Sequence, residues 1–265
     1  MDLGLRDRVY LVTGGSRGLG YATAEALVAD GAKVVLSSRD EQAVRSAATA
    51  LGDGATGLAA DNADPGTPAR LIAEAESRFG RLDGALISVG GPPGGTVMGN
   101  TDEQWQQAFE SVFLGAVRLA RTVAEDLTKG AEGDPHARVP GEERGSIAFV
   151  LSSSVRQPIN GLAISNGLRP GLGMVVKSLG DELGPLGVRV NGLMPGRIAT
   201  DRVRELDTRA GDPDAVRIER SKGIPLRRYA EPWEFGKAAA FVLSPAASYV
   251  TGINLPIDGG ILRTI

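Results

Sequence analysis

A glycine-rich turn follows the first apolar run of the chain and opens its first helical stretch. The turn lies between an expected strand at residues 8–13 and an expected helix at 19–30. Glycines let the backbone turn tightly and approach a pyrophosphate, while a helix N-terminus supplies N–H donors and a partial positive charge. The pattern therefore predicts a dinucleotide-binding site. Its expected residues here are Thr13, Gly14, Ser16, Arg17, Gly18, Leu19 and Gly20.

The end of the second expected strand bears on which dinucleotide binds. An NAD site usually places an acidic residue about 20 residues past the glycines, where it holds the ribose 2′-hydroxyl. Here Ser38 and Arg39 occupy that place, with Arg17 as a second cation on the same side. A hydroxyl and a guanidinium can bind a 2′-phosphate, which an acid would repel. The sequence predicts NADP(H), the alternative being that both arginines are ordinary solvated charges.

Short apolar runs alternate with amphipathic or alanine-rich stretches along the chain. Expected strands lie at 8–13, 33–37, 57–60, 84–88, 146–151, 188–193 and 253–257, and expected helices at 19–30, 40–51, 68–79, 102–129, 162–183 and 232–243. Strands that are apolar on both faces and separated by helices indicate a parallel sheet covered on two sides. We therefore predict an α/β fold: a single Rossmann-type domain over residues 1–265, with a doubly wound, parallel, seven-stranded sheet and helices on both faces.

Two segments interrupt this alternation. Residues 130–145 form a polar stretch that joins a helix to a strand, so we expect it on the face opposite the ligand crevice and predict that His136 is a solvated loop residue. Residues 197–228 follow the sixth strand and should hang over the crevice as a substrate lid. This segment carries more Arg and Lys than Asp and Glu. It is either a mobile, solvated lid or a substrate-gripping segment that favours anions.

Composition excludes several classes of function. The chain has no cysteine and one histidine, which excludes thiolate nucleophiles, cysteine metal sites and multi-histidine metal sites; we predict no metal. The net charge of −3 gives no indication of the excess positive charge that binds nucleic acid or an anionic membrane surface. No apolar run approaches the length of a membrane span, and no signal peptide opens the chain, so we expect a cytoplasmic protein.

Further landmarks appear in a fixed order after the glycine-rich turn. Thr-Gly-x-x-x-Gly-x-Gly at Thr13–Gly20, Ser88-Val-Gly90, Val190-Asn191 and the Asp-Gly-Gly that ends at Gly260 span nearly the whole chain. In these motifs the chain resembles the short-chain dehydrogenase/reductase family, and in general character the 3-oxoacyl-acyl-carrier-protein reductases. The resemblance implies further cofactor-binding residues. They are Asp61, Asn62, Ser88, Gly90, Pro195, Gly196, Ile198 and Thr200.

The catalytic positions implied by the resemblance are mostly altered. The family uses Asn, Ser, Tyr and Lys, in which the Tyr hydroxyl is the general acid or base and the Lys lowers its pKa. Ser152 occupies the serine position, with its neighbours Ser153 and Ser154 as alternatives within the triplet, Ser165 the tyrosine position thirteen residues on, and Arg169 the lysine position. Val112 stands where Asn is expected. Some members carry the same Ser-Asn-x-x-Arg pattern and a Gly-Gly-Pro loop, as at Gly90–Gly94 here, which indicates a divergent branch.

These substitutions remove the proton relay that Tyr and Lys provide in the family. A serine hydroxyl titrates far above a phenol, whose pKa is about 10, and an arginine stays charged, so neither relays a proton as Tyr and Lys do. Ser152 and Ser165 would hydrogen-bond a carbonyl oxygen, Arg169 would stabilise developing charge, and Tyr229 is the only remote candidate for a substitute acid.

We predict an NADP(H)-dependent oxidoreductase that interconverts a carbonyl and an alcohol of a small molecule. The alternative is a catalytically silent NADP(H)-binding sensor or regulatory protein, and non-redox chemistry with a bound dinucleotide is a third reading. The resemblance also implies a homo-oligomer, a tetramer or a dimer.

Overall fold

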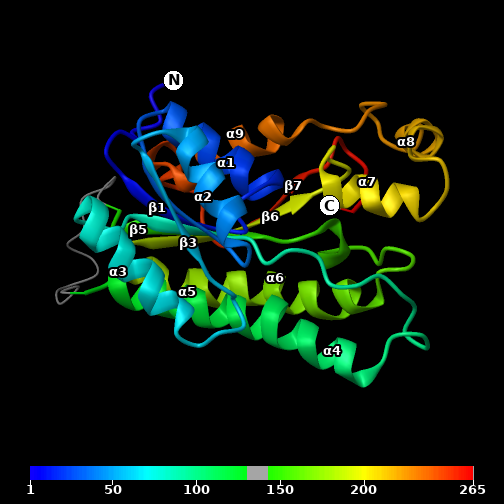
Figure 1. The fold of residues 1–265 in the computed structure, drawn as a ribbon, viewed down its shortest axis with the longest axis horizontal. Helices are drawn as coiled ribbons and strands as arrows, with labels where there is room; N and C mark the ends of the chain where they lie inside the picture. Colours follow the sequence, from blue (N-terminus) through cyan, green and yellow to red (C-terminus); the bar gives the residue numbers. More distant parts are fainter. Residues whose placement is uncertain (130–142, 265) are drawn as a thin grey trace.

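The computed structural model describes residues 1–129 and 143–264, so His136 and most of the polar stretch at 130–145 lie outside the described residues. Within these ranges seven strands form one sheet, in the order β3-β2-β1-β4-β5-β6-β7, and all neighbours pair in parallel (Figure 1). The strands are β1 (Val9–Thr13), β2 (Lys33–Ser38), β3 (Ala55–Ala59), β4 (Gly84–Ile87), β5 (Gly145–Val150), β6 (Val188–Pro195) and β7 (Asn254–Ile257). The predicted doubly wound parallel sheet is confirmed.

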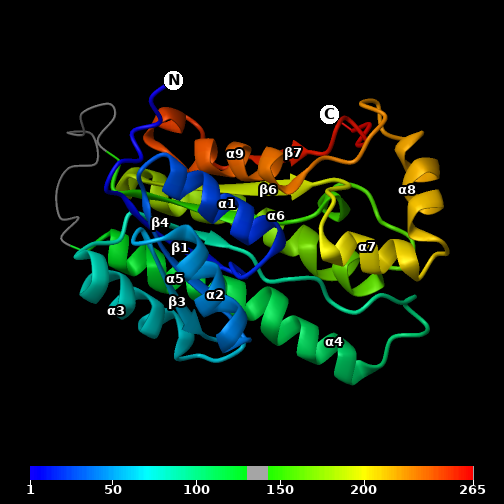
Figure 2. The same ribbon diagram turned by 45° about the horizontal axis from the view of Figure 1, so that its top comes forward.

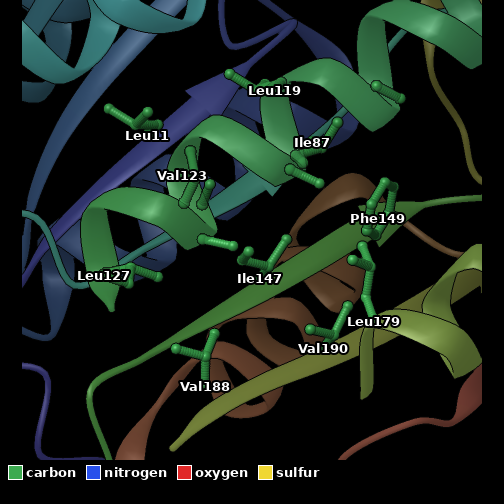
Figure 3. Packing of buried hydrophobic residues seen from close by; sticks show 14 of the residues in the cluster. Leu11, Ile87, Leu119, Val123, Leu127, Ile147, Phe149, Leu179, Val188 and Val190 are labelled. Carbon is green, nitrogen blue, oxygen red and sulfur yellow. The ribbon is translucent and has the colours of Figure 1, made fainter. Parts of the chain in front are cut away.

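Helices cover both faces of the sheet (Figure 1). One face carries α1 (Gly18–Ala29), α2 (Glu41–Leu51) and α9 (Pro232–Leu243); the other carries α3 (Thr67–Phe79), α5 (Gly115–Leu127) and α6 (Ala163–Leu183). Side chains alternate along β1, so Leu11 packs in one core cluster and Tyr10 and Val12 in the other. Figure 3 shows the cluster that contains Leu11; in it, Leu119 and Val123 of α5 lie over Ile147 of β5. Each such buried side chain stabilises the fold by about 1.5–3 kcal/mol.

The ends of the first two helices follow from single residues. Gly31, just beyond α1, has φ +87°, a left-handed conformation that glycine adopts without strain. The Asp40 carboxylate accepts the Ala43 N–H at 2.9 Å and so caps α2. Both ends were predicted from the sequence.

The helix expected at 102–129 is divided into three parts. It consists of α4 (Asp102–Ala108), a π-helical stretch η1 (Phe109–Leu114), and α5. Gly115, which follows the π-helical stretch, packs closely against the backbone of Asn62: a Cβ at position 115 would lie 2.3 Å from the Asn62 carbonyl oxygen. Short 3₁₀ turns complete the described helices: η3 (Ser153–Val155), η4 (Gly184–Leu186) and η5 (Pro245–Ala247).

The segment at 197–228, called the lid below, follows the carboxyl end of β6 (Figures 1 and 2). It contains two helices, α7 (Asp201–Thr208) and α8 (Pro213–Ser221). The Thr200 hydroxyl accepts the Val203 N–H at the start of α7, and the Asp212 carboxylate accepts the Ala215 N–H at the start of α8. These capped helices give the lid a defined backbone.

Arg189 fastens the end of α9 to the sheet. It lies on β6, next to the edge strand β7, its side chain is 6% exposed, and its Nε donates to the Glu143 carboxylate at 2.6 Å. The last carbonyls of a helix have no partner inside the helix, so they need donors from elsewhere. The guanidinium donates to the Val242, Leu243 and Ser244 carbonyls at this end, and to the Val250 carbonyl in the segment before β7.

We predict that Arg189→Met lowers the free energy of unfolding by about 3–5 kcal/mol, because it leaves the buried Glu143 carboxylate and the Val242 carbonyl without a donor. Urea unfolding monitored by circular dichroism measures the change. Arg204→Met on the exposed side of α7 is the control, expected within about 0.5 kcal/mol of the parent. A loss below about 1 kcal/mol for Arg189→Met would contradict this role.

Candidate cofactor and substrate site

A large pocket lies at the carboxyl ends of the strands, with a volume of about 1910 Å³. A site for one drug-sized ligand usually measures about 300–1,000 Å³, so this pocket has room for a dinucleotide together with a second molecule. Its walls are the glycine-rich turn, the ends of β2 and β3, the loops after β4, β5 and β6, and the lid. Among the predicted site residues it brings together Gly14, Ser16, Arg17, Gly18, Leu19, Gly20, Ser38, Arg39, Asp61, Asn62, Ser88, Gly90, Ser152, Ser165, Arg169, Pro195, Gly196, Ile198 and Thr200.

The glycine-rich turn is shaped as a phosphate cradle requires. Gly14 and Gly18 both have φ +60°, and a Cβ on Gly20 would lie 2.3 Å from the Gly14 carbonyl oxygen. Arg17 precedes α1 without capping it through its side chain, so no side chain occupies the first N–H groups of that helix. These observations fit a dinucleotide pyrophosphate at this turn.

Among the predicted cofactor-binding residues, Thr13 is the one that does not line the pocket. It is fully buried, and its hydroxyl donates to the Ser88 carbonyl at 2.9 Å and accepts the Ser88 N–H at 2.8 Å. Thr13 therefore ties the ends of β1 and β4 together. The structure gives it a positioning role behind the wall.

At the end of β2 the two predicted phosphate ligands differ in their surroundings. The Ser38 hydroxyl donates to the Asp40 carbonyl at 2.9 Å, so its proton already has an acceptor. Arg39 is exposed, and no carboxylate of the described residues forms an ion pair with it. Arg17 lies 3.9 Å from Asp201, and both side chains are exposed, a weak pair in water. Arg39 is thus the available cation at this end of the pocket.

The turn before α6 is held by Asn166. Its side-chain amide accepts the Ile159 N–H and donates to the Ile159 carbonyl, both at 2.9 Å. The Gly95 N–H donates to the Gly161 carbonyl at 2.8 Å, and the Ala163 N–H returns to Gly95 at 3.1 Å. The loop after β4 and the start of α6 are therefore joined, which fixes the place of Ser165 in the first turn of α6.

Ser165 pairs with Ser154, one of the two alternatives to Ser152 within the serine triplet. Its hydroxyl lies 3.2 Å from the Ser154 hydroxyl, and both residues are buried. The thirteen-residue spacing points instead to Ser152, whose hydroxyl accepts the Ser154 N–H at 3.1 Å. Ser152 and Ser165 line the pocket, whereas Ser154 does not. Only the three-dimensional turn η3 could reveal that Ser154 holds Ser165.

Arg169 is a buried cation beside the pocket, 6% exposed. One guanidinium nitrogen donates to the Val150 carbonyl and another to the Gly90 carbonyl, each at 2.5 Å, while its Nε has no partner. Burial lowers the pKa of Arg169 to about 10, which leaves it charged at neutral pH. No carboxylate of the described residues pairs with it, so its charge is uncompensated.

Neither Val112 nor Tyr229 offers a proton donor to the pocket. Val112 is buried in η1 and lines the pocket with an apolar side chain. The Tyr229 hydroxyl donates to the Asp207 carboxylate at 3.1 Å, and Tyr229 does not line the pocket. Burial raises the pKa of Tyr229. The structure therefore gives no support to Tyr229 as a substitute acid.

Comparison with known proteins identifies the family. A family model described as enoyl-(acyl carrier protein) reductase matches residues 14–262. The chain is 31% identical to the 3-oxoacyl-(acyl-carrier-protein) reductase FabG of Escherichia coli, over 96% of each chain. It is 30% identical to the short-chain reductase protein NovJ of Streptomyces niveus, over 96% of this chain and 94% of that one. The chain belongs to the short-chain dehydrogenase/reductase family.

Solved structures of the short-chain dehydrogenase/reductase type share the whole fold. L-sorbose reductase from Gluconobacter frateurii, complexed with NADPH and L-sorbose, superposes with a TM-score of 0.90 at 28% identity, covering 100% of both chains. A short-chain dehydrogenase/reductase from Brucella melitensis gives 0.86 at 26% identity, again over 100% of both. The predicted family and fold are confirmed.

We predict that Arg169→Lys lowers the free energy of unfolding of this short-chain dehydrogenase/reductase by about 1.5–3 kcal/mol. A single ammonium does not span the Val150 and Gly90 carbonyls, so one charged hydrogen bond is lost. Urea unfolding measures the change. Arg156→Lys, the same substitution at an exposed arginine, is the control. Equal midpoints for parent and Arg169→Lys would show that the two-carbonyl contact contributes nothing.

Proposed function

We propose that the protein is an NADP(H)-dependent oxidoreductase that interconverts a carbonyl and an alcohol through a non-standard active site. The observation that carries this is one pocket lined both by the dinucleotide cradle and by Ser152, Ser165 and Arg169. The curated relatives are reductases, and the chain covers nearly their full length. We further propose that residues 1–265 form one domain with residues 197–228 as its substrate lid.

The choice of NADP(H) rests on charge at the end of β2. Arg39 is an available cation there, and no acidic side chain replaces it to hold a ribose 2′-hydroxyl. The first turn of α1 and Gly14–Gly20 would hold the pyrophosphate, with Asp61, Asn62, Ser88, Gly90, Pro195, Gly196, Ile198 and Thr200 along the remaining length. L-sorbose reductase, the structural relative above, binds NADPH. When bound, the nicotinamide supplies the hydride.

The chain's own groups orient the substrate and stabilise charge. The hydroxyls of Ser152 and Ser165 would donate hydrogen bonds to the carbonyl oxygen, and Ser154 would orient Ser165. The uncompensated Arg169 charge would stabilise the negative charge that develops on that oxygen. Neither Ser165 nor Arg169 delivers a proton near neutral pH. The proton therefore comes from water or from the substrate, at a cost of about 10²–10⁴ in rate relative to a positioned acid.

The setting of the protein is also proposed. We propose that the protein is cytoplasmic. We also propose that it forms a homo-oligomer, a dimer or tetramer, because Phe109 and Met174 expose apolar surface on η1 and α6. No helix in the described part of the chain is long and apolar enough to cross a membrane.

We predict that Arg39→Gln weakens NADPH binding by about 10–100-fold and leaves NADH binding within about twofold, because only NADPH has the phosphate that Arg39 would hold. Fluorescence titration of both cofactors measures this. Arg45→Gln is the matched control: Arg45 is exposed on α2, pairs with Glu41, and does not line the pocket. If Arg39→Gln and Arg45→Gln bind NADPH equally well, the assignment of Arg39 is wrong.

We predict that the protein oxidises NADPH in the presence of at least one ketone, 1,2-diketone or quinone, followed by loss of nicotinamide absorbance. Ser152→Ala should lower kcat by about 10²–10³, because it removes a donor to the developing oxyanion. Ser77→Ala, on the exposed side of α3, should leave kcat unchanged. Tight NADPH binding without turnover on any compound would instead favour the silent NADP(H)-binding protein.

A further inference from the structure

The lid lines its end of the pocket with arginines. The pocket is lined by Arg202 and Leu206 of α7 and by Arg209 at its C-terminal end. Their spacing puts them on one face of the helix. Arg197, the first residue of the lid, and Arg220 of α8 line the pocket as well. The lid therefore lines the pocket with four cations and with two carboxylates, those of Asp201 and Glu205.

Two of these arginines share a single carboxylate. Asp207 is buried, and one of its oxygens accepts from both Arg197, at 3.4 Å, and Arg220. Its other oxygen accepts the Tyr229 hydroxyl at 3.1 Å. Burial, followed by the nearby Arg220 charge, lowers the pKa of Arg197. One positive charge of this pair is thus left without a counterion.

The Arg209 guanidinium has no hydrogen-bond or ion-pair partner among the described residues. Its guanidinium extends from the end of α7 to the opposite wall, where Nη1 lies 3.9 Å from the position of a Cβ on Gly94. Arg202 differs, because it lies 3.5 Å from Glu205 and donates to the Pro92 carbonyl at 2.9 Å. Arg202 holds the lid to the loop after β4, whereas Arg209 remains available.

The rest of the pocket does not neutralise this surplus. Glu103 and Glu110 line the wall formed by α4 and η1, but neither forms an ion pair with a lid arginine in the described residues. The buried Arg169, with an unpartnered Nε, adds a further uncompensated charge on the same pocket. Cations in a partly desolvated pocket attract an anion and form strong, charge-assisted hydrogen bonds with it.

We propose that the lid end of the pocket binds an anionic group of the substrate, a carboxylate or a phosphate ester, through Arg209 and Arg220. This inference rests on the proposed function, since it makes the substrate an anionic carbonyl compound. The cofactor's phosphates are assigned elsewhere, to the glycine-rich turn and the end of β2. The lid charges are therefore left for the second ligand.

Methyl ketones with a carboxylate at the far end test the proposal. A series with two to five methylenes between carbonyl and carboxylate is compared with the corresponding methyl esters, and dihydroxyacetone phosphate with dihydroxyacetone. We expect kcat/KM for at least one anion to exceed that of its neutral partner by 10-fold or more. Arg209→Gln and Arg220→Gln should abolish the preference. Arg204→Gln, which removes a cation of α7 that does not line the large pocket, should keep it.

Calorimetric titration of the same compounds into NADP⁺-saturated protein gives a readout that does not need turnover. Binding of the anion that weakens 10-fold or more in Arg209→Gln supports the subsite even if no compound is reduced, in which case only the proposed reductase function fails. Equal kcat/KM and equal binding for every anion and its neutral partner overturn the subsite, whether or not the ketones are reduced. A loss of NADPH affinity in Arg209→Gln equal to the loss of substrate affinity also overturns it, because the arginine then serves the cofactor.

Discussion

The pocket depends on one buried guanidinium. Arg169 reaches from α6 to the Val150 carbonyl at the end of β5 and to the Gly90 carbonyl in the loop after β4. It thereby joins three elements that form the inner wall of the pocket, and it does so without a carboxylate partner. A buried charge costs free energy unless polar groups surround it, and two carbonyl dipoles supply only part of that compensation. The uncompensated part of the Arg169 charge therefore acts electrostatically on a ligand that binds beside it in the pocket.

This constraint connects the architecture to the proposed chemistry. A doubly wound sheet places its crevice where the strand order reverses, here between β1 and β4, and the Thr13 hydroxyl joins those two strand ends. The same ends support the dinucleotide cradle on one side and the Ser152, Ser165 and Arg169 wall on the other. Hydride delivery needs only that geometry. In the proposed mechanism, charge stabilisation falls to Arg169 and the serine hydroxyls, and the lid arginines extend the positive field outward.

Much of this could be predicted from the sequence, because the relevant signals are local. The alternation of strands and helices, the cap at Asp40 and the glycine at position 31 each depend on neighbours a few residues away. The family followed from motifs in a fixed order, and the comparisons confirmed it. The roles of individual site residues stay predictions.

Contacts between distant segments were beyond the reach of sequence patterns. The pairing of Ser154 with Ser165 depends on the η3 turn, and the placement of Thr13 behind the wall depends on its contact with Ser88. The π-helical stretch within the helix expected at 102–129 has no signal in the hydrophobic period. The partners of Tyr229 come from the folded lid. In each case the deciding neighbour is remote in the chain or set by a backbone turn that side-chain patterns do not encode.

The central claim is that Arg169 supplies charge stabilisation while no side chain relays the proton. The pH dependence of kcat/KM for NADPH-dependent ketone reduction, between pH 6 and 9, tests it most directly. We expect a flat profile, because Arg169 stays charged and Ser165 stays neutral throughout this range. A break in that range that disappears in Tyr229→Phe would contradict it, since it would show that a tyrosine delivers the proton after all.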